Sequence, residues 1–300
     1  MLPKHCPLCG ALSDSSKVVT RHVFGKENDK YAFFYCSSCT VNYLHPQLSE
    51  SEAAEFYNKE FEKFMDSRTP GKSWLTPEDH IELNRLTFER RLEYLSPYIT
   101  SGNSVLDIGS SSGFMLLPLA EKGMDVWGIE PSGYFSDFSK KKGINTYNSL
   151  DSLTAHKGDK KFDLVMSFFV MEHVPDPSVF VKQCLELKKD SGKVIIEIPS
   201  AHDPLYSLYD FPEFERFYWS IAHHWYFTQK SIEFILNPLK VEYEILKYQR
   251  YGLANHLTWA YKGAPGGNKE LSEIFELGID ASYKTGLVKA GYFDTMVIVI

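Results

Sequence analysis

The sequence predicts an α/β protein with a doubly wound, mostly parallel sheet of seven strands and a small N-terminal lobe. From residue 103 onward, short apolar runs alternate with amphipathic stretches of helical length, which is typical of a sheet covered by helices on both faces. Two cysteine pairs lie within the first 39 residues. We therefore divide the chain into a lobe at 1–47, a helical linker or cap at 48–100, and a core at 101–300 with an aromatic insertion at 201–227.

Composition limits the classes of function. The chain has 300 residues, 43% of them hydrophobic, and a formal net charge of −7, whereas nucleic-acid-binding domains are usually basic. No run approaches the 18 apolar residues of a membrane span, and the first residues lack the apolar segment of a signal peptide. We expect a cytoplasmic protein with no membrane span, and the charge disfavours a nucleic-acid partner without excluding a local basic patch. The sequence leaves the oligomeric state open.

The N-terminal lobe carries two CxxC pairs, CPLC and CSSC, in a turn-rich segment with β-prone stretches at 17–23 and 31–35. Two such knuckles supply four thiolates, the ligand set of a closed structural Zn²⁺ site. The predicted ligands are Cys6, Cys9, Cys36 and Cys39, in a zinc-ribbon-like lobe. His5 and His45 flank them as competing ligands, and four free cysteines are the alternative. Cys184, on an amphipathic stretch, is expected to be a small buried hydrophobe.

The linker and the core give a definite order of elements. Two helices are expected in the linker, one from residue 49 and one over 77–95, where apolar residues recur at helical spacing, with a loop at 67–74 between them. In the core, strands are predicted at 103–109, 124–131, 144–149, 162–170, 193–200, 241–249 and 293–300. Helices are predicted at 114–123, 134–143, 177–192, 228–239 and 268–291.

The turn after the first core strand reads D-I-G-S-S-S-G, with Gly109 and Gly113 four positions apart. In open α/β sheets, ligands bind at the carboxyl ends of the strands. The next strand ends in Glu130, 21 residues after Gly109, where a carboxylate accepts hydrogen bonds from ribose hydroxyls. Together these features predict a nucleoside cofactor. A dinucleotide pattern would require glycine where Ser111 and Phe114 stand, and no P-loop sequence follows.

This arrangement resembles motif I, DxGxGxG, of the class I S-adenosylmethionine-dependent methyltransferases, with Ser111 in place of the middle glycine. The segment VMEHVPDP after the fourth strand and an antiparallel last strand extend the resemblance to roughly residues 75–300. It implies a Rossmann-like methyltransferase fold that binds S-adenosylmethionine. The cofactor-binding residues it implies are Asp107, Gly109, Ser111, Gly113, Glu130, Pro131, Ser149, Leu150 and Phe168. The alternative is a doubly wound fold whose glycine loop is only a tight turn.

The aromatic insertion contains ten aromatic residues between positions 206 and 227, a density that suggests a lid or pocket wall. A simple hydrophobic cover over the sheet edge is the alternative for any single ring. With the cysteine lobe and the H-H-W-Y-F-T segment at 223–228, it resembles the C-methyltransferases of nucleotide-linked deoxysugars. His224 matches a histidine that takes part in base chemistry there, while Ile221 and His223 stand where that family has tyrosine and glutamate. The candidate bases are His224, then His173, then His223.

These observations predict S-adenosylmethionine-dependent methyl transfer, to carbon or oxygen, on a small polar metabolite such as a nucleotide-linked sugar or a surface-glycan precursor. One alternative is an RNA or protein methyltransferase that docks through the zinc lobe. Another is a catalytically degenerate protein that binds only the cofactor or a partner.

Overall fold

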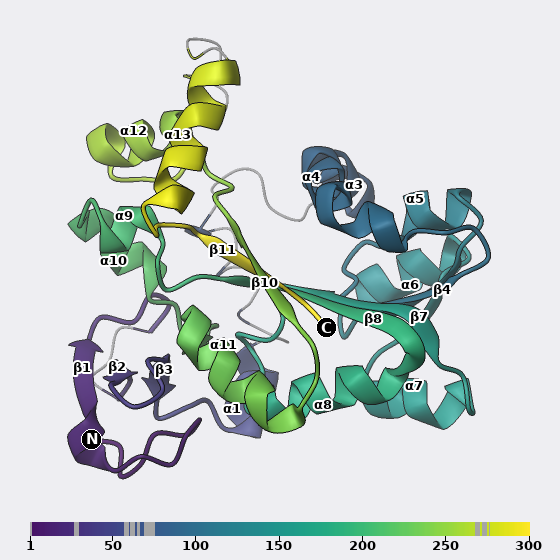
Figure 1. Cartoon of the computed structure of the whole chain (residues 1–300), viewed down its shortest axis with the longest axis horizontal. Helices are drawn as coiled ribbons and strands as arrows, with labels where there is room; N and C mark the ends of the chain where they lie inside the picture. Colours follow the sequence, from purple (N-terminus) through teal and green to yellow (C-terminus); the bar gives the residue numbers. More distant parts are fainter. Residues whose placement is uncertain are drawn as a thin grey trace. The chain divides into compact units, whose positions relative to one another are not determined.

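A computed structural model describes residues 2–26, 30–56, 60, 64, 67–68, 76–267, 271, 275 and 277–300 (Figure 1). The chain forms two compact units that exchange segments along the sequence. Unit 1 comprises Met1–Ser73, Glu172–Pro177 and Ile198–Val297, and unit 2 comprises Trp74–Met171, Ser178–Glu197 and Ile298–Ile300. The predicted division at residues 47 and 100 remains a prediction, because the units follow a different grouping.

Unit 1 contains a four-stranded antiparallel sheet in the order β1-β2-β3-β9. Its strands are β1 (Ser16–Thr20), β2 (Ala32–Cys36), β3 (Asn42–His45) and β9 (Trp225–Tyr226). Asn42 lies opposite Tyr226, and Tyr43 lies opposite Trp225. The N-terminal segment and the aromatic insertion therefore share one sheet, although about 180 residues separate them in sequence.

The aromatic insertion supplies much of the core of unit 1. The ring of Trp219 lies 5.0 Å from that of Phe33 and 4.8 Å from that of Tyr226, measured between centroids. Six of the ten aromatic residues between 206 and 227 are buried: Phe214, Tyr218, Trp219, Trp225, Tyr226 and Phe227. Most of these rings therefore belong to the core of unit 1, which agrees with the hydrophobic cover. Burying them removes a large apolar area from water.

The helices of unit 1 include a well-capped first helix. The hydroxyl of Ser49 accepts the N–H of Glu52, and the carboxylate of Glu52 accepts the N–H of Ser49, which fixes the start of α1. The helices are α1 (Glu50–Glu55), α9 (Pro204–Ser207), α10 (Pro212–Tyr218), α11 (Gln229–Leu236), α12 (Leu253–Lys262) and α13 (Leu277–Lys289). Most of the predicted loop at 67–74, and most of the predicted helix before residue 277, lie outside the described residues.

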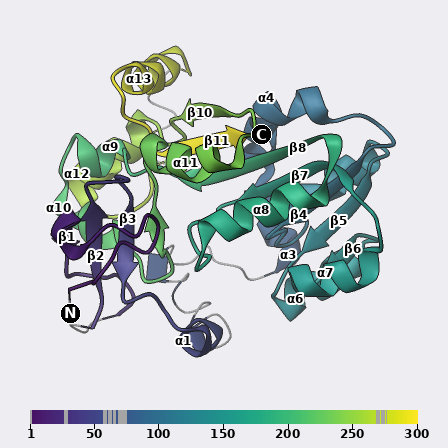
Figure 2. The ribbon, with the colours of Figure 1, turned by 60° about the horizontal axis from the view of Figure 1, so that its bottom comes forward.

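The large sheet has seven strands in the order β10-β11-β8-β7-β4-β5-β6, which confirms the predicted fold class (Figure 2). The strands are β4 (Ser104–Ile108), β5 (Asp125–Ile129), β6 (Asn145–Tyr147), β7 (Phe162–Phe168), β8 (Lys188–Pro199), β10 (Glu244–Tyr248) and β11 (Thr295–Val299). The pairs among β4 to β8 are parallel. Val194 and Ile300 exchange both backbone hydrogen bonds, as antiparallel partners do, so the last strand is antiparallel as predicted.

The helices of the methyltransferase-like core connect these strands. They are α5 (Leu116–Glu121), α6 (Gly133–Lys141), α7 (Leu150–Lys157) and α8 (Pro177–Leu187). Pro118 is tolerated at the third position of α5, where a backbone N–H has no partner within the helix. Cys184 is fully buried, as expected. None of the helices within the described ranges combines the length and the apolar character needed to cross a membrane.

The predicted helix at 77–95 is two helices, α3 (Pro77–Leu83) and α4 (Arg85–Leu95). Its apolar pattern is misleading, since Leu83 is 56% exposed and Leu86 is 67% exposed. The buried residues of α4 include Arg91, which forms an ion pair with the fully buried carboxylate of Glu197 at 2.6 Å. The buried face of α4 therefore includes an ion-paired arginine beside Tyr94 and Leu95, whereas the sequence pattern predicts a face made of apolar residues alone.

Candidate functional site

The turn between β4 and α5 is shaped by residues with left-handed backbone. The φ angle is +83° at Gly109 and +75° at Gly113, a region that glycine enters without steric cost. A Cβ on Gly109 would lie 2.5 Å from Cγ2 of Val170. Ser111 also has a positive φ, +50°, which explains why the resembled motif carries glycine at this position.

Glu130 anchors this turn from the end of β5. Its carboxylate accepts the backbone N–H of Ser111 at 2.7 Å and that of Ser132 at 2.8 Å. Burial raises the pKa of Glu130, and the two N–H donors oppose that rise. Each carboxylate oxygen retains a further acceptor site, so Glu130 is held ready to accept the hydroxyls of a ribose.

Two buried oxygen atoms beside the turn have no hydrogen-bond partner among the described residues, namely Oδ1 of Asp107 and Oγ of Ser111. Burial raises the pKa of Asp107 to about 7, with a smaller contribution in the opposite direction from Arg91. A buried acceptor without a donor is costly. The ammonium and hydroxyl donors of S-adenosylmethionine are groups that would satisfy these atoms, so the predicted cofactor fits the residues present.

The other predicted cofactor residues are also in unit 2. Pro131 is exposed directly after Glu130. The hydroxyl of Ser149 accepts the N–H of Ser152 and so caps α7, of which Leu150 is the first residue. Phe168 ends β7, with the guanidinium of Arg91 3.9 Å from its ring centroid. Ser149 thus has a structural role that accounts for its hydroxyl without a contact to adenine.

Sequence reasoning missed two groups in unit 2. Nδ1 of His80 lies 2.8 Å from Oγ of Ser112, within the glycine turn, and burial lowers the pKa of His80 to about 4. The fully buried Glu197 accepts hydrogen bonds from Arg90, Arg91 and Tyr94. Neither group follows a local motif, because α3 and α4 reach these positions only through the tertiary fold.

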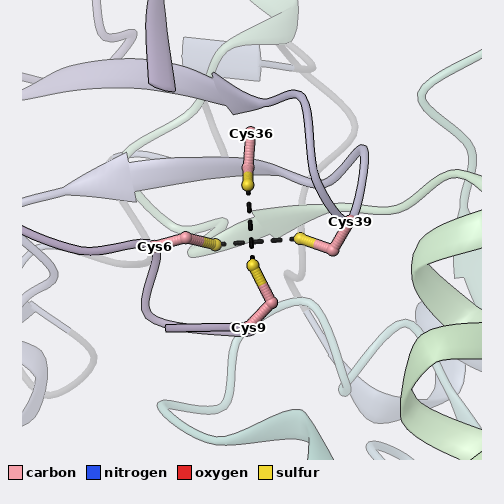
Figure 3. Close-up of side chains that lie close together, drawn as sticks. All are labelled: Cys6, Cys9, Cys36 and Cys39. Carbon is pink, nitrogen blue, oxygen red and sulfur yellow. Dashed lines mark hydrogen bonds between the residues drawn. The ribbon is translucent and has the colours of Figure 1, made fainter. Parts of the chain in front are cut away.

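The four cysteines of unit 1 point toward one centre (Figure 3). The Sγ atoms of Cys6 and Cys39 are 3.7 Å apart, and those of Cys9 and Cys36 are 3.6 Å apart. A disulfide would require about 2.05 Å, whereas a tetrahedron with Zn–S bonds of about 2.3 Å has edges of about 3.8 Å. The arrangement therefore has the dimensions of a tetrathiolate metal site.

The chemistry of the sulfur atoms agrees with these dimensions. The hydrogen bond from Cys39 lowers the pKa of Cys6 to about 5, while the same pairing and burial raise the pKa of Cys39. The thiolate is the form of cysteine that binds metal. The lowered pKa therefore favours this form at Cys6. Three of the four cysteines are buried, and four thiolates would fill a tetrahedral ion completely, which leaves no coordination position open for a substrate.

A second polar cluster in unit 1 gathers Glu172 and His173 with His223 and His224. The ring centroids of His173 and His223 are 4.8 Å apart, and Nε2 of His173 lies 3.8 Å from Oε1 of Glu172. The backbone carbonyl of Glu172 accepts the N–H of His224 at 2.8 Å. The structure therefore brings together all three histidines that the sequence nominated, and adds Glu172 to them.

The histidines of this cluster differ in their access to solvent. His224 is 3% exposed, and its Nδ1 has no hydrogen-bond partner in the described structure. The rings of His173 and His223 are only partly buried. Burial lowers the pKa of His173 and of His224 to about 4 each, and it also lowers the pKa of His223 well below its usual range. All three are neutral at pH 7.

A separate cavity of about 640 Å³ opens in unit 1. Tyr35 and Asn42 of the small sheet line it, together with Tyr206 from the aromatic insertion and Lys230 and Glu233 of α11. It includes none of the predicted site residues. We assign it no function.

Comparisons with known proteins agree with the geometry of unit 2. The ubiquinone biosynthesis O-methyltransferase of Coxiella burnetii (strain RSA 493 / Nine Mile phase I) is 31% identical over 142 residues, which cover 45% of this chain and 59% of that protein. The protein of the same name from Pasteurella multocida (strain Pm70) is 28% identical over 140 residues, covering 41% and 58%. The chain thus spans less than two thirds of these relatives.

The fold also has counterparts of known structure. The plantazolicin methyltransferase BpumL, solved in complex with SAH, matches with a TM-score of 0.50 and 15% identity over 83% of this chain and 93% of that chain. At this identity the likeness shows the fold alone. The family model described as a methyltransferase domain matches residues 80–238 of the 300. Because this match covers more than half of the sequence, the chain belongs to the methyltransferase domain family.

Proposed function

We propose that the protein transfers a methyl group from S-adenosylmethionine to a small polar metabolite. The observation that carries the proposal is the turn after β4, where Glu130 holds the N–H of Ser111 and the buried Oδ1 of Asp107 has no donor among the described residues. A carboxylate for the ribose and a carboxylate for the ammonium are the groups that this cofactor requires. Membership of the methyltransferase domain family supports the same assignment.

In this proposal each residue of unit 2 has a distinct task. Glu130 accepts the ribose hydroxyls, and Asp107 holds the ammonium group of the amino-acid tail. Gly109 and Gly113 allow the backbone to approach the cofactor closely. When bound, S-adenosylmethionine supplies a methyl group on a sulfonium, already activated for attack. The protein aligns the acceptor and removes its proton.

The histidine cluster supplies the base in this proposal. The oxygen or carbon of the acceptor would lose its proton to an imidazole nitrogen of the cluster, which would leave that oxygen or carbon able to take the methyl group. His224 is the first candidate because it matches the histidine of the sugar C-methyltransferases, and its Nδ1 has no hydrogen-bond partner among the described residues. His173 and His223 are alternatives with more exposed rings.

The acceptor is proposed to be a small molecule because the charge balance gives no support to an RNA substrate. The net charge of −7 does not provide the electrostatic attraction on which nucleic-acid binding relies. The finer proposal, a nucleotide-linked sugar, depends on the likeness of residues 223–228 to the sugar C-methyltransferases. A panel of nucleotide-linked keto-sugars and of catechols, with S-adenosylhomocysteine release as the readout, tests this finer proposal. Release with the sugars would support it, whereas release with the catechols alone would favour an aromatic acceptor.

We propose in addition that the four cysteines bind one structural Zn²⁺. The sulfur–sulfur separations of 3.6 and 3.7 Å support this ligand set. Elemental analysis should find at least one zinc per chain, and Cys36→Ser should contain one equivalent less and lose much of the stability of unit 1. A folded wild-type protein that contains no metal after purification in zinc-supplemented medium would contradict the assignment.

Calorimetry with S-adenosylhomocysteine tests the cofactor site. We expect one binding event per chain, weakened at least about 100-fold by Glu130→Gln, since two hydrogen bonds to a charged group are lost. The matched control is Glu121→Gln, an exposed glutamate of α5 in the same unit, which should bind like wild type. Equal affinity in the two variants would remove Glu130 from the site and with it the basis of the proposal.

A further inference from the structure

The histidine cluster of unit 1 contains a second set of metal-ligand atoms besides the cysteines. Ligand atoms of Glu172, His173 and His223 all lie within 4.8 Å of one another. Glu172 is fully buried, whereas both histidines are partly exposed. Two imidazoles and one carboxylate are a ligand set that divalent transition metals accept with coordination positions left open.

The orientation of His173 suits a metal ligand. Its Nδ1 donates a hydrogen bond of 2.6 Å to the backbone carbonyl of Ala222, since a carbonyl can only accept. The neutral ring therefore carries its lone pair on Nε2, the atom that lies 3.8 Å from Oε1 of Glu172. Metal-binding histidines almost always fix their tautomer through such a hydrogen bond from the other ring nitrogen.

His223 contributes an atom that needs a partner. Its Nδ1 is buried and has no hydrogen bond within the described part of the chain. The ring meets His173 edge-on, with an interplanar angle of 80°. A buried polar nitrogen without a partner is uncommon in folded proteins. A metal ion bound by this cluster would supply a partner for this nitrogen.

The backbone around the cluster is tied together before any ion binds. The carbonyl of Glu172 accepts the N–H of His224 at 2.8 Å and that of Trp225 at 3.2 Å. The indole N–H of Trp225 donates to the carbonyl of Val174 at 2.8 Å. The two segments that carry the ligands are thus held in register, as a pre-organised site requires.

We propose that Glu172, His173 and His223 bind one divalent first-row transition-metal ion. Mixed nitrogen and oxygen ligands favour ions such as Zn²⁺, Co²⁺ or Fe²⁺ over Mg²⁺ and Ca²⁺, which prefer oxygen alone. Three protein ligands leave a coordination position open, as in catalytic metal sites and unlike the closed cysteine site. The chain would then hold two metal ions of different kinds within unit 1.

The charges around the site indicate what fills the open position. Glu172 supplies the one negative charge of the ligand set. A divalent ion here would leave a net positive site, which a hydroxyl oxygen of the methyl acceptor would balance after it loses its proton. The ion would polarise that oxygen and ease loss of its proton. This role rests on the proposed methyl transfer, whereas the metal site itself does not.

Cobalt titration of the full chain, without cofactor or acceptor, tests the site. The cysteine site is first filled with one equivalent of Zn²⁺, which thiolates hold more tightly than Co²⁺, and Co²⁺ is then added. We expect one further equivalent to bind, with weak ligand-field bands and no sulfur-to-cobalt charge transfer. His223→Gln and Glu172→Gln should each weaken this binding by roughly 100-fold or more, because even supporting residues of metal sites cost 10–100-fold.

The control variant is His22→Ala, an exposed histidine of unit 1, which should bind Co²⁺ like wild type. Retention of one Zn²⁺ in each variant shows that unit 1 is folded. The proposal is overturned if no second equivalent binds below millimolar Co²⁺, or if its binding survives both substitutions. Failure of S-adenosylhomocysteine binding alone would instead contradict the proposed function and leave the metal site standing.

Discussion

The cofactor turn of unit 2 and the histidine cluster of unit 1 are built in opposite ways. The turn is one continuous stretch, 107–113, supported by Glu130, and most of its defining contacts are made by the backbone. The cluster joins two segments about 50 residues apart, Glu172–His173 and His223–His224, through their side chains as well as their backbones. In our proposal, cofactor binding at the turn therefore depends mainly on backbone conformation. Proton removal at the histidine cluster depends instead on which side chains are present.

This difference predicts which substitutions separate binding from turnover. Changes in the turn should alter stability and cofactor affinity together, because the same backbone serves both. Changes in the histidine cluster should alter turnover while leaving the cofactor site of unit 2 intact.

The largest expected effect is on turnover in His224→Gln. Loss of a general base lowers the rate by about 10² to 10⁴-fold, whereas affinity for S-adenosylhomocysteine should stay within about twofold of wild type. The measurement is S-adenosylhomocysteine release with the methyl acceptor, which the isotope-labelling experiment described below identifies. The control is His22→Ala, at an exposed histidine, which should turn over like wild type. Full turnover in a folded His224→Gln protein would exclude His224 as the base.

The next effect concerns the backbone of the turn and uses two glycines of similar conformation. Gly109→Ala should destabilise the protein by roughly 2–4 kcal/mol, the sum of left-handed strain and overpacking, because its Cβ would lie 2.5 Å from Val170. Gly102 has φ +86° and open space around it, so Gly102→Ala should cost only the strain, about 1–2 kcal/mol. Urea denaturation measures both, and equal costs would show that the contact with Val170 is unimportant.

A third effect is a pH dependence of cofactor affinity that comes from Asp107. Its pKa is raised to about 7 by burial, so the carboxylate that would hold an ammonium is lost below that pH. Affinity for S-adenosylhomocysteine should fall up to about tenfold per pH unit below about 7 and level off above it. Asp107→Asn should remove this dependence. A wild-type affinity that stays constant between pH 5.5 and 8 would contradict the assigned contact.

The same shift sets the sign of a stability effect without cofactor. The pKa of Asp107 in the fold, about 7, lies above the ordinary value of 3.8, so the folded state binds more protons between these values. Its contribution to the free energy of unfolding therefore decreases as pH rises through this window. Asp107→Asn should weaken the decrease, which thermal denaturation between pH 5 and 8 measures.

The smallest effect is expected at Ser111, which adopts φ +50°. Ser111→Gly removes the strain of that conformation but gives the unfolded chain more freedom, so the net gain should be at most about 1 kcal/mol. Ser112→Ala should have the opposite sign, a loss of about 1 kcal/mol, because it removes the partner of His80. A clear destabilisation by Ser111→Gly would indicate that its hydroxyl has a structural role.

The comparison also explains how much the sequence predicts. The seven strands of the large sheet and the turn with Glu130 follow local patterns, in which apolar runs, glycines and an acidic residue recur at fixed spacing. Local sequence patterns do not predict β9, a two-residue strand whose partner is β3. They also do not predict the burial of Arg91, which is stabilised by Glu197, a residue far away in the sequence.

The candidate site divides along the same line. The residues 107–113 and Glu130 were predicted because adjacent parallel strands place their carboxyl ends together. The four cysteines were predicted from two local pairs, and their geometry fits a common centre. The three histidines were nominated one at a time, and only the fold shows that they meet around Glu172. The packing of the aromatic insertion could not be predicted from local patterns, because its partner, the small sheet, lies at the other end of the sequence.

The central claim, methyl transfer to a small molecule, is tested most directly by isotope labelling. The purified protein is incubated with S-adenosylmethionine carrying a labelled methyl group and a whole-cell extract of its source organism, and the products are separated by size. The account predicts label in the small-molecule fraction, dependent on Glu130 and accompanied by equimolar S-adenosylhomocysteine. Label in RNA or protein, or no transfer by a protein that binds the cofactor, would contradict it.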